Sequence, residues 1–258
     1  LTLANLTITG GNVPDASGGD VRNAGTLSLE RVKVAGNSAG GVFGATEPEL
    51  RVTTDGADAK RSVDLAFDAA GNSVLVWEQR GAAASAYYLQ WFAADGARQG
   101  DPVLLDEGVP LGTVEGRTVA VATAPAGDCI VAWVGNEGGA NGLGVYYRRF
   151  RADHTAYEAK VRANALTSGD QVAPDVAMLD AGNFLVVWQD NAVRDASGAS
   201  IQARQYSGGA LRGQYRVNDA TAQDQTAPSV VLRPDGTYLV AYVNDQWAVD
   251  KGVYARQG

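Results

Sequence analysis

One short apolar segment occurs four times along the chain, and this repetition constrains the fold more than any other feature. The copies are SVLVW at 73–77, CIVAW at 129–133, FLVVW at 184–188 and YLVAY at 238–242. Their closing aromatic residues are almost evenly spaced: Trp77, Trp133, Trp188 and Tyr242. A period of about 55 residues, built from segments this short, predicts a repeat architecture made of β-strands.

Each repeat is expected to contribute four strands. The apolar segment is hydrophobic at nearly every position, which is typical of a strand buried on both faces. A glycine turn such as Asp235-Gly236 joins it to the strand before it and indicates a hairpin. In the first repeat the expected strands are 63–67, 73–77, 88–92 and 102–106. Four antiparallel strands per unit predict an all-β fold, a β-propeller with about four four-stranded blades. A stacked β-sandwich is the alternative, but it gives no reason for the period.

The last repeat lacks a fourth strand before the chain reaches Gly258. Residues 50–53 (LRVT) resemble residues 215–218 (YRVN), and the arginine of each segment stands at the same distance before the next closing aromatic residue. We therefore expect residues 49–54 to form a clasp strand that completes the last blade and removes exposed sheet edges. The alternative is an open arc of a larger propeller.

Residues 1–40 do not follow the period of about 55 residues. The pair Leu6/Ile8 recurs as Val32/Val34, and each pair is followed by Gly and Asn. This pattern resembles the rungs of a right-handed parallel β-helix, as in bacterial surface and pectate-lyase-like proteins. A loose strand pair docked on the neighbouring domain is the alternative. The predicted domains are a β-helix-like fragment at 1–40, a linker at 41–48 and the repeat domain at 49–258.

Composition excludes several classes of function. The 258 residues carry a net charge of −8, which argues against binding to nucleic acids and to anionic membrane surfaces. No apolar run approaches the roughly 20 residues of a membrane-spanning helix. The single cysteine rules out an internal disulfide and a cysteine-rich zinc site. Because the sequence begins at Leu1 without a signal peptide, we expect it to be a piece of a longer protein.

The third and fourth repeats show a fuller motif: a Gln, then Pro, an apolar strand ending in an aromatic residue, an Arg, and Arg-Val-Asn. It is clearest at 171–188 with Arg204 and 216–218, and at 225–242 with Arg256. The motif resembles a repeat of large bacterial secreted and surface proteins. The resemblance implies a propeller-like module of an exported protein in an adhesive or scaffolding context, and it carries no catalytic motif. The first two repeats depart from it, since Gly116 replaces the Gln and Gln90 replaces the Arg.

Two residue types that often carry chemistry are assigned to structure. His154 aligns with Gly96, so we expect it at a turn with positive φ rather than in a catalytic triad. Cys129 lies in an apolar strand, where we expect a buried, unreactive thiol. Arg148, Arg204 and Arg256 recur at the repeat spacing, which favours hydrogen bonds between blades.

Two carboxylates occupy equivalent places on the strand expected nearest the propeller axis. These are Asp64 and Asp175, whereas Ala120 and Ser229 fill the same position in the other repeats. A pair of carboxylates facing a central channel is the arrangement that glycosidases use. The simpler interpretation is that both residues line a narrow, water-filled channel.

The loops after the second strand of each repeat differ in length and sequence, which is typical of a recognition surface on a rigid scaffold. Trp247 is the candidate contact for a ligand, because an exposed aromatic residue offers a sugar or protein a large contact area. Asp190, Asp195 and Asp245 are candidate polar contacts or calcium ligands, since Ca²⁺ takes several oxygen ligands. The simpler alternative is that these loop carboxylates are only solvated. Apart from Ca²⁺, the sequence does not identify a metal.

Together these features predict a non-enzymatic interaction, adhesion or scaffolding module, secreted or on a cell surface. We expect a monomeric module with no cofactor other than Ca²⁺, which binds a protein or a glycan and neither nucleic acid nor a membrane. The alternative is a carbohydrate-active propeller enzyme, similar to a glycoside hydrolase, that uses Asp64 and Asp175.

Overall fold

The structure is a computed structural model, and the chain divides into two compact units at residues 1–56 and 57–258. In the first unit it describes the backbone of six short strands and residues 51–53. In the second unit it describes residues 58–110, 114, 116–138, 142–192, 198–219, 221, 223–246 and 250–258. Each unit is described by itself.

The second unit consists of antiparallel sheets whose strands follow chain order, with one sheet for each repeat. Sheet 1 contains β7 (Ala59–Phe67), β8 (Ser73–Arg80), β9 (Ser85–Phe92) and β10 (Arg98–Val109). Sheet 2 contains β11 (Val119–Thr123), β12 (Cys129–Asn136), β13 (Leu143–Phe150) and β14 (Val161–Arg162). Sheet 3 contains β15 (Gln171–Asp180), β16 (Asn183–Asp190), β17 (Ser200–Ser207) and β18 (Ala210–Arg216). Sheet 4 contains β19 (Gln225–Leu232), β20 (Tyr238–Gln246) and β21 (Asp250–Gln257).

The hairpin turns between first and second strands follow the local sequence. In the turn between β7 and β8, Asp68 Oδ1 accepts hydrogen bonds from the backbone N–H groups of Ala70 and Asn72. Gly71 in this turn and Gly127 in the next have positive φ angles of 86° and 98°, a conformation that glycine adopts without strain. The predicted glycine hairpins are confirmed at these turns.

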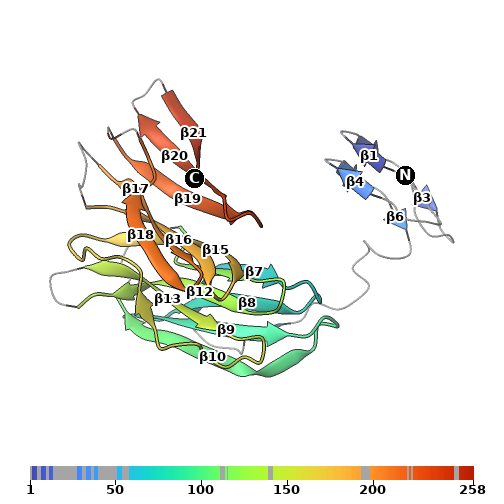
Figure 1. The fold of residues 1–258 in the computed structure, drawn as a ribbon. Coiled ribbons are helices and arrows are strands. Elements are labelled where there is room, and N and C mark those ends of the chain that lie inside the picture. Colours follow the sequence, from blue (N-terminus) through green and yellow to red (C-terminus); the bar gives the residue numbers. More distant parts are fainter. Residues whose placement is uncertain are drawn as a thin grey trace. The chain divides into compact units, whose positions relative to one another are not determined.

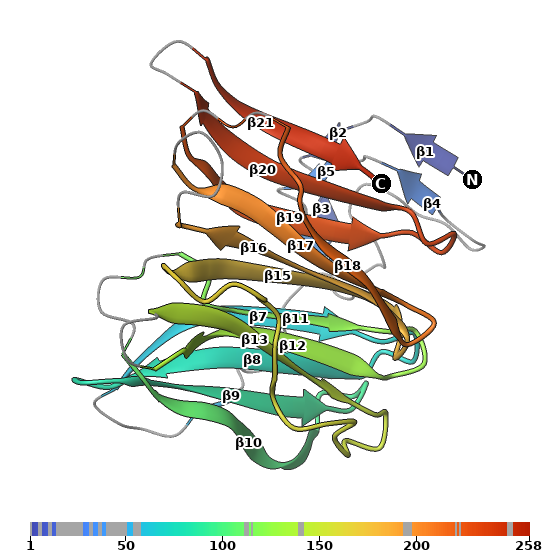
Figure 2. The same cartoon turned by 60° about the vertical axis from the view of Figure 1, so that its left-hand side comes forward.

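Three hydrophobic clusters hold the sheets together face to face, one at each junction between consecutive sheets. The first strands of consecutive sheets, β7, β11, β15 and β19, lie next to one another. Figures 1 and 2 show the sheets in chain order, from β7–β10 at one end to β19–β21 at the other. Sheets that pack face to face with their first strands together are the blades of a β-propeller, so the predicted fold class is confirmed.

The closing aromatic residues are buried at equivalent places, as the repeat predicts. Trp77, Trp133 and Trp188 are all buried, and the indole N–H of Trp133 donates to Asp106 Oδ2 of sheet 1 at 3.0 Å. Arg204 and Arg256 donate to the backbone carbonyls of Ala163 and Val217, each of which directly follows the last strand of the preceding sheet. The prediction of hydrogen bonds between blades is confirmed for these two arginines.

Arg148 is an exception to that prediction. Its Nε donates to the carbonyl of Glu158, in the segment between β13 and β14 of its own repeat, and its guanidinium lies over the ring of Phe150. Arg148 therefore stabilises its own blade, and for this arginine the predicted bond between blades is wrong.

The predicted clasp strand is not found among the described residues. Residues 51–53 belong to no strand, and in the described part of the chain sheet 4 has three strands, ordered β19-β20-β21. Leu50 and Thr54 lie outside the described residues. As described, the fourth sheet ends at β21.

In the first unit, the six strands that the structure describes form three parallel pairs. These strands are β1 (Thr2–Ala4), β2 (Thr7–Thr9), β3 (Asn12–Val13), β4 (Ser28–Glu30), β5 (Lys33–Ala35) and β6 (Ser38–Ala39). β1 pairs with β4, β2 with β5 and β3 with β6. Ile8 is the partner of Val34, which is the match that the recurring apolar pairs of the sequence indicate.

Candidate functional site

The carboxylates Asp64 and Asp175 lie at the same position of the first strands of sheets 1 and 3. In each strand the pairing register shifts just before the aspartate, between Arg61 and Asp64 and between Val172 and Asp175. These shifts mark β-bulges, which bend a strand and re-aim the side chains that follow. The bulge therefore sets the direction of each carboxylate.

The bulges contain non-glycine residues in the left-handed region. Ser62 has a φ of 45° and Ala173 a φ of 49°, each two residues before its aspartate. Sheet 4 repeats the feature, since Ala227, with a φ of 51°, precedes Ser229 by two residues. Backbone strain of this kind persists only where the surrounding structure enforces it, and it is concentrated at functional sites.

Each carboxylate is held by a backbone N–H group of the next first strand. Asp64 Oδ2 accepts a hydrogen bond from Val121 N at 2.9 Å, across the junction of sheets 1 and 2. Asp175 Oδ2 accepts one from Val230 N at 2.8 Å, across the junction of sheets 3 and 4. These bonds fix one oxygen of each carboxylate and connect neighbouring blades.

Arg117 pairs with the second oxygen of Asp175. It lies just before β11, and its Nη1 donates to Asp175 Oδ1 in an ion pair. Asp175 is buried, and burial raises its pKa. The charge of Arg117 and the hydrogen bonds from the N–H groups of Val230 and Val176 lower the pKa. The negative charge of Asp64 raises it further. The net shift of the Asp175 pKa is upward.

Arg117 and Asp175 are thus in contact, and Asp64 lies near enough for its charge to raise the pKa of Asp175. The carboxyl group of Asp175 keeps its proton to a higher pH than an ordinary aspartate, and the charge of Asp64 influences its ionisation. A carboxyl group with a raised pKa and a second carboxylate are the two groups that acid–base cleavage of a glycoside uses. Sequence reasoning missed Arg117, although it occupies the repeat position that Arg61 occupies in the first repeat.

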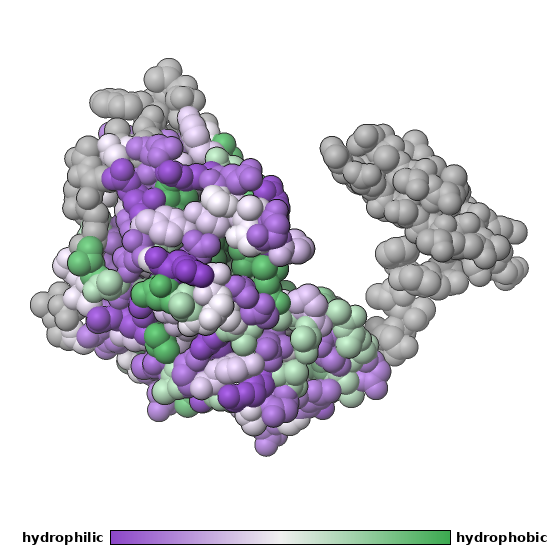
Figure 3. All heavy atoms as spheres, viewed as in Figure 1, coloured by the Kyte–Doolittle hydropathy of each residue, from purple (hydrophilic) through white to green (hydrophobic). Residues whose placement is uncertain are grey.

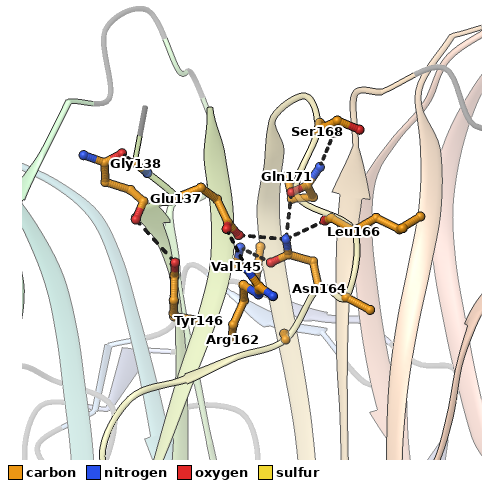
Figure 4. A network of polar contacts seen from close by, with 12 residues as sticks. Glu137, Gly138, Val145, Tyr146, Arg162, Asn164, Leu166, Ser168 and Gln171 are labelled. Carbon is orange, nitrogen blue, oxygen red and sulfur yellow. Dashed lines mark hydrogen bonds and ion pairs between the residues drawn. The ribbon is translucent and has the colours of Figure 1, made fainter. Parts of the chain in front are cut away.

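Asp190, a predicted loop contact, lies in a buried polar network. Its Oδ1 accepts hydrogen bonds from Gln171 Nε2 at 3.2 Å and from the N–H of Ala192 at 3.0 Å. Gln171 in turn accepts from Asn164 Nδ2 at 2.9 Å, and Asn164 also donates to Glu137 (Figure 4). The network connects sheets 2 and 3 through Gln171 of the motif and Asn164, which ends an Arg-Ala-Asn segment at the place of Arg-Val-Asn.

The same arrangement recurs between sheets 3 and 4. Asn218 Nδ2 donates to Gln225 Oε1 at 2.8 Å, and Gln225 Nε2 donates to Asn244 Oδ1 at 3.3 Å. All three side chains are buried. The motif residues that the third and fourth repeats share are therefore structural links between blades.

Of the other predicted loop residues, the structure describes Asp245. Trp247 and Asp195 lie outside the described residues. Asp245 is half-buried on β20, where its N–H donates to the carbonyl of Asp224 at 2.9 Å. Across the ranges that the structure describes, no group of three or more His, Cys, Asp or Glu side chains lies together. Calcium binding stays a prediction.

Glu78, at the end of β8, is a buried carboxylate outside the candidate site. It accepts hydrogen bonds from Arg80 Nε at 2.6 Å, Ser85 Oγ at 2.7 Å and Thr118 Oγ1 at 2.7 Å. Burial raises the pKa of Glu78, but these three bonds outweigh it and hold the pKa below its ordinary value. An ionised carboxylate with this many partners connects sheets 1 and 2 rather than serving as an acid.

His154 and Cys129 have the structural roles expected of them. His154 has a φ of 69°, at the turn position where Gly96 has a φ of 82°. Its imidazole stacks on the indole of Trp91 with 4.3 Å between ring centroids. Cys129 is buried, and burial raises the pKa of its thiol to about 12.

No protein-family model matches the chain, and no curated protein matches it. Several solved structures are similar, among them the GH93 alpha-L-arabinofuranosidase of Fusarium graminearum in complex with arabinobiose. That structure is 10% identical, has a TM-score of 0.50, and the match covers 76% of this chain and 61% of that one. The Penicillium chrysogenum alpha-L-arabinanase complexed with arabinobiose is 12% identical, with a TM-score of 0.48 and coverage of 77% and 62%. A subtype N10 neuraminidase-like protein of A/little yellow-shouldered bat/Guatemala/060/2010 is 8% identical, with a TM-score of 0.45 and coverage of 76% and 59%.

The likeness to the arabinofuranosidase concerns the fold, and it supports a β-propeller-like architecture. This chain spans 61% of the length of that enzyme. The comparison also corrects two predictions: a non-enzymatic interaction module and the absence of enzymatic activity. The arabinofuranosidase, which shares this fold, is an enzyme of the glycoside hydrolase type, and this finding overturns both predictions. In the part of the chain that the structure describes, no helix is long and apolar enough to span a membrane.

Proposed function

We propose that residues 57–258 belong to a carbohydrate-active enzyme of the glycoside hydrolase type, in which Asp64 and Asp175 are the two catalytic carboxylates. The observation that carries the proposal is the state of Asp175. It is a buried carboxyl group on a first strand, its pKa is raised, and it is coupled electrostatically to Asp64. The fold that this chain shares with a glycoside hydrolase supports the same proposal.

Asp175 acts as the general acid. Its proton passes to the glycosidic oxygen as the bond between that oxygen and the anomeric carbon breaks, so that the leaving group departs as a neutral alcohol. Asp64 is the second carboxylate, which assists the incoming nucleophile at the anomeric carbon. Because Oδ2 of each carboxylate is held by a backbone N–H group, the geometry is organised before the substrate arrives.

Arg117 positions the acid. Its side chain is 42% exposed while that of Asp175 is 10% exposed, so the guanidinium lies between the carboxyl group and solvent. There it is placed to donate hydrogen bonds to substrate hydroxyl groups. The net charge of −8 repels polyanions, and a neutral glycan therefore fits the site better than a uronic-acid polymer.

A hydrolysis screen tests the proposal. The full chain is assayed on aryl glycosides of neutral sugars, with arabinofuranosides and arabino-oligosaccharides first. Asp175→Asn and Asp64→Asn should each lower kcat/KM by about 10²–10⁴-fold, the range for removing an acid–base group. Asp180→Asn is the matched control, because Asp180 is an exposed turn aspartate whose carboxylate also accepts backbone hydrogen bonds. Absence of turnover on the whole panel, or equal loss in the control, would contradict the proposal.

We infer that residues 1–40 form a β-helix-like segment that accompanies this enzymatic unit in the chain. The parallel pairing of β1 with β4, β2 with β5 and β3 with β6, all at the same offset along the sequence, supports this inference. Since no candidate catalytic residue lies in the segment, deleting residues 1–40 should leave the turnover of the propeller unchanged.

A further inference from the structure

Thr118 is a buried polar residue that lies directly before β11 and follows Arg117 in the sequence. Figure 3 shows hydrophilic residues over much of the visible surface of the second unit. Thr118 and Glu78 are instead 0% exposed. A polar group that is shielded from water needs a hydrogen-bond partner inside the protein. The partners of these two residues therefore indicate which parts of the chain they hold in place.

Three groups of Thr118 are hydrogen-bonded to neighbouring strands. Its hydroxyl donates to Glu78 Oε2 at 2.7 Å, and its N–H donates to Ser62 Oγ at 2.7 Å. Its carbonyl accepts a hydrogen bond from the N–H of Val134, on β12, at 2.9 Å. Ser62 and Glu78 belong to β7 and β8 of sheet 1. Thr118 is therefore fixed from both sides of the junction between sheets 1 and 2.

Glu78 is a strong acceptor for the Thr118 hydroxyl. Its Oε1 accepts hydrogen bonds from Arg80 and Ser85, which leaves Oε2 for Thr118. The pKa of Glu78 is held below its ordinary value, so the carboxylate stays ionised where an ordinary glutamate begins to take up a proton. Hydrogen bonds to an ionised acceptor are stronger than those between neutral groups. The bond from Thr118 to sheet 1 is therefore of the stronger kind.

The Arg117 side chain has much less support of its own. It is 42% exposed, and within the described ranges its guanidinium is hydrogen-bonded to Asp175 alone. A long, exposed side chain loses rotational freedom when it is held in one ion pair. Because the backbone of Thr118 is fixed, the Arg117 side chain starts from a fixed point and has fewer arrangements to lose.

The repeat contains a simpler form of the same link. At the junction between sheets 3 and 4, Gln189 takes the place of Glu78. Its Oε1 accepts from the N–H of Ala227, which takes the place of Thr118, at 3.3 Å. The residue before Ala227 is Thr226, so this link has no arginine beside it. The junction between sheets 1 and 2 adds a charged acceptor, a donor hydroxyl and an arginine to a link that the repeat already uses.

The link also connects the strands that carry the two carboxylates. Ser62 lies in the bulge of β7, two residues before Asp64. Asp64 Oδ2 accepts from the N–H of Val121, so β7 holds β11 at two places, through Ser62 and through Asp64. The arginine that precedes the first of these places pairs with Asp175. The placement of Asp64 and the pairing of Asp175 thus depend on the same joint.

We propose that Thr118 is a positioning residue of the candidate site, which directs the guanidinium of Arg117 onto Asp175. Thr118 acts through Arg117 and is not itself a catalytic residue. This role rests on the proposed function, in which Asp175 is the acid. The pairing of Arg117 with Asp175 can nevertheless be measured without any turnover.

Removal of the Thr118 hydroxyl tests the proposal. Thr118→Val keeps the shape of the side chain but loses the bond to Glu78, so Arg117 should pair less often with Asp175. The Arg117 charge lowers the pKa of Asp175, so this pKa should rise above its wild-type value. The rise should be smaller than in Arg117→Ala, which removes the charge. Carbon-13 NMR of the aspartate carboxyl groups in the full chain measures the pKa, and the Asp175 signal is identified by its absence from Asp175→Asn.

Further variants separate this role from a general loosening of the junction. Ser62→Ala removes the second bond to sheet 1 and should also raise the Asp175 pKa, whereas Thr118→Ser keeps the hydroxyl and should titrate as the wild type. Thr123→Val is the matched control, because the Thr123 hydroxyl, also on β11, donates across the same junction to the carbonyl of Phe67. Thermal unfolding checks that each variant is folded. An unchanged Asp175 pKa in Thr118→Val and Ser62→Ala, or an equal rise in Thr123→Val, overturns the proposal.

Activity gives a separate measurement on any substrate that the hydrolysis screen finds. The alkaline limb of kcat/KM should lie at a higher pH in Thr118→Val than in the wild type, because Arg117 and Asp64 are the charged groups that most affect the pKa of Asp175 and the variant leaves Asp64 in place. A chain without hydrolytic activity would contradict the proposed function, while the NMR titration would still decide whether Thr118 positions Arg117. An active chain whose alkaline limb and Asp175 pKa are the same in Thr118→Val would overturn the positioning role and leave the proposed function standing.

Discussion

At the scale of single residues, the repeat motif accounts for hydrogen bonds between blades rather than for a catalytic site. Gln171 and Gln225 were visible in the sequence as shared residues, and the structure shows each bridging an asparagine and the end of the second strand. The sequence also showed that Asp64 and Asp175 are equivalent. It did not show that Arg117 would reach Asp175, because these residues lie on different repeats and only packing of the sheets brings them together.

Replacing Gln225 tests the structural role of the motif. Gln225→Ala leaves the buried amide of Asn218 without its Gln225 partner, so we expect the free energy of unfolding to fall by about 1–3 kcal/mol. Chemical denaturation measures the change. Gln257→Ala, at an exposed glutamine near the end of β21, should change stability by less than about 0.5 kcal/mol. Equal effects at the two positions would contradict the role assigned to Gln225.

At the scale of elements, the strands were predictable and the bulges within them were not. The expected segments 63–67, 73–77 and 88–92 all lie within β7, β8 and β9. The bulge residues share a left-handed conformation, but their residue types do not predict it: Ser62, Ala173 and Ala227. Two of them contact a neighbouring sheet, since Ser62 Oγ accepts from Thr118 N and Ala227 N donates to Gln189 Oε1, and such long-range contacts are not encoded in the local sequence.

A β-branched residue in one bulge tests whether this conformation is enforced. Ala173→Val places a branched side chain at a φ of 49°, so we expect a loss of about 1–3 kcal/mol in stability. Ala165→Val, at an exposed alanine outside the bulges, should have little effect. If the proposed acid depends on the bulge for its direction, Ala173→Val should also lower kcat at temperatures where the variant is fully folded. An unchanged kcat at those temperatures would show that the bulge does not orient the Asp175 carboxyl group.

At the scale of the whole molecule, the period of the apolar segments was enough to predict a β-propeller. It was not enough to predict how the ring ends. The similarity of residues 50–53 to residues 215–218 suggested a clasp, yet residues 51–53 form no strand, and Val63 and Val253 remain exposed at the two ends. The function was harder to predict than the fold. Two carboxylates spaced by two repeats look the same in sequence whether they line a channel or one of them donates a proton.

The pH dependence of kcat/KM tests the central claim most directly. A general acid works only while protonated, so activity should fall as the pH rises through the pKa of Asp175. Because that pKa is raised, we expect the fall at a higher pH than for an ordinary aspartate. Asp175→Asn should abolish this alkaline limb and leave a low residual rate, whereas Asp180→Asn should retain the wild-type profile. An alkaline limb that persists unchanged in Asp175→Asn would contradict the assignment of Asp175 as the acid.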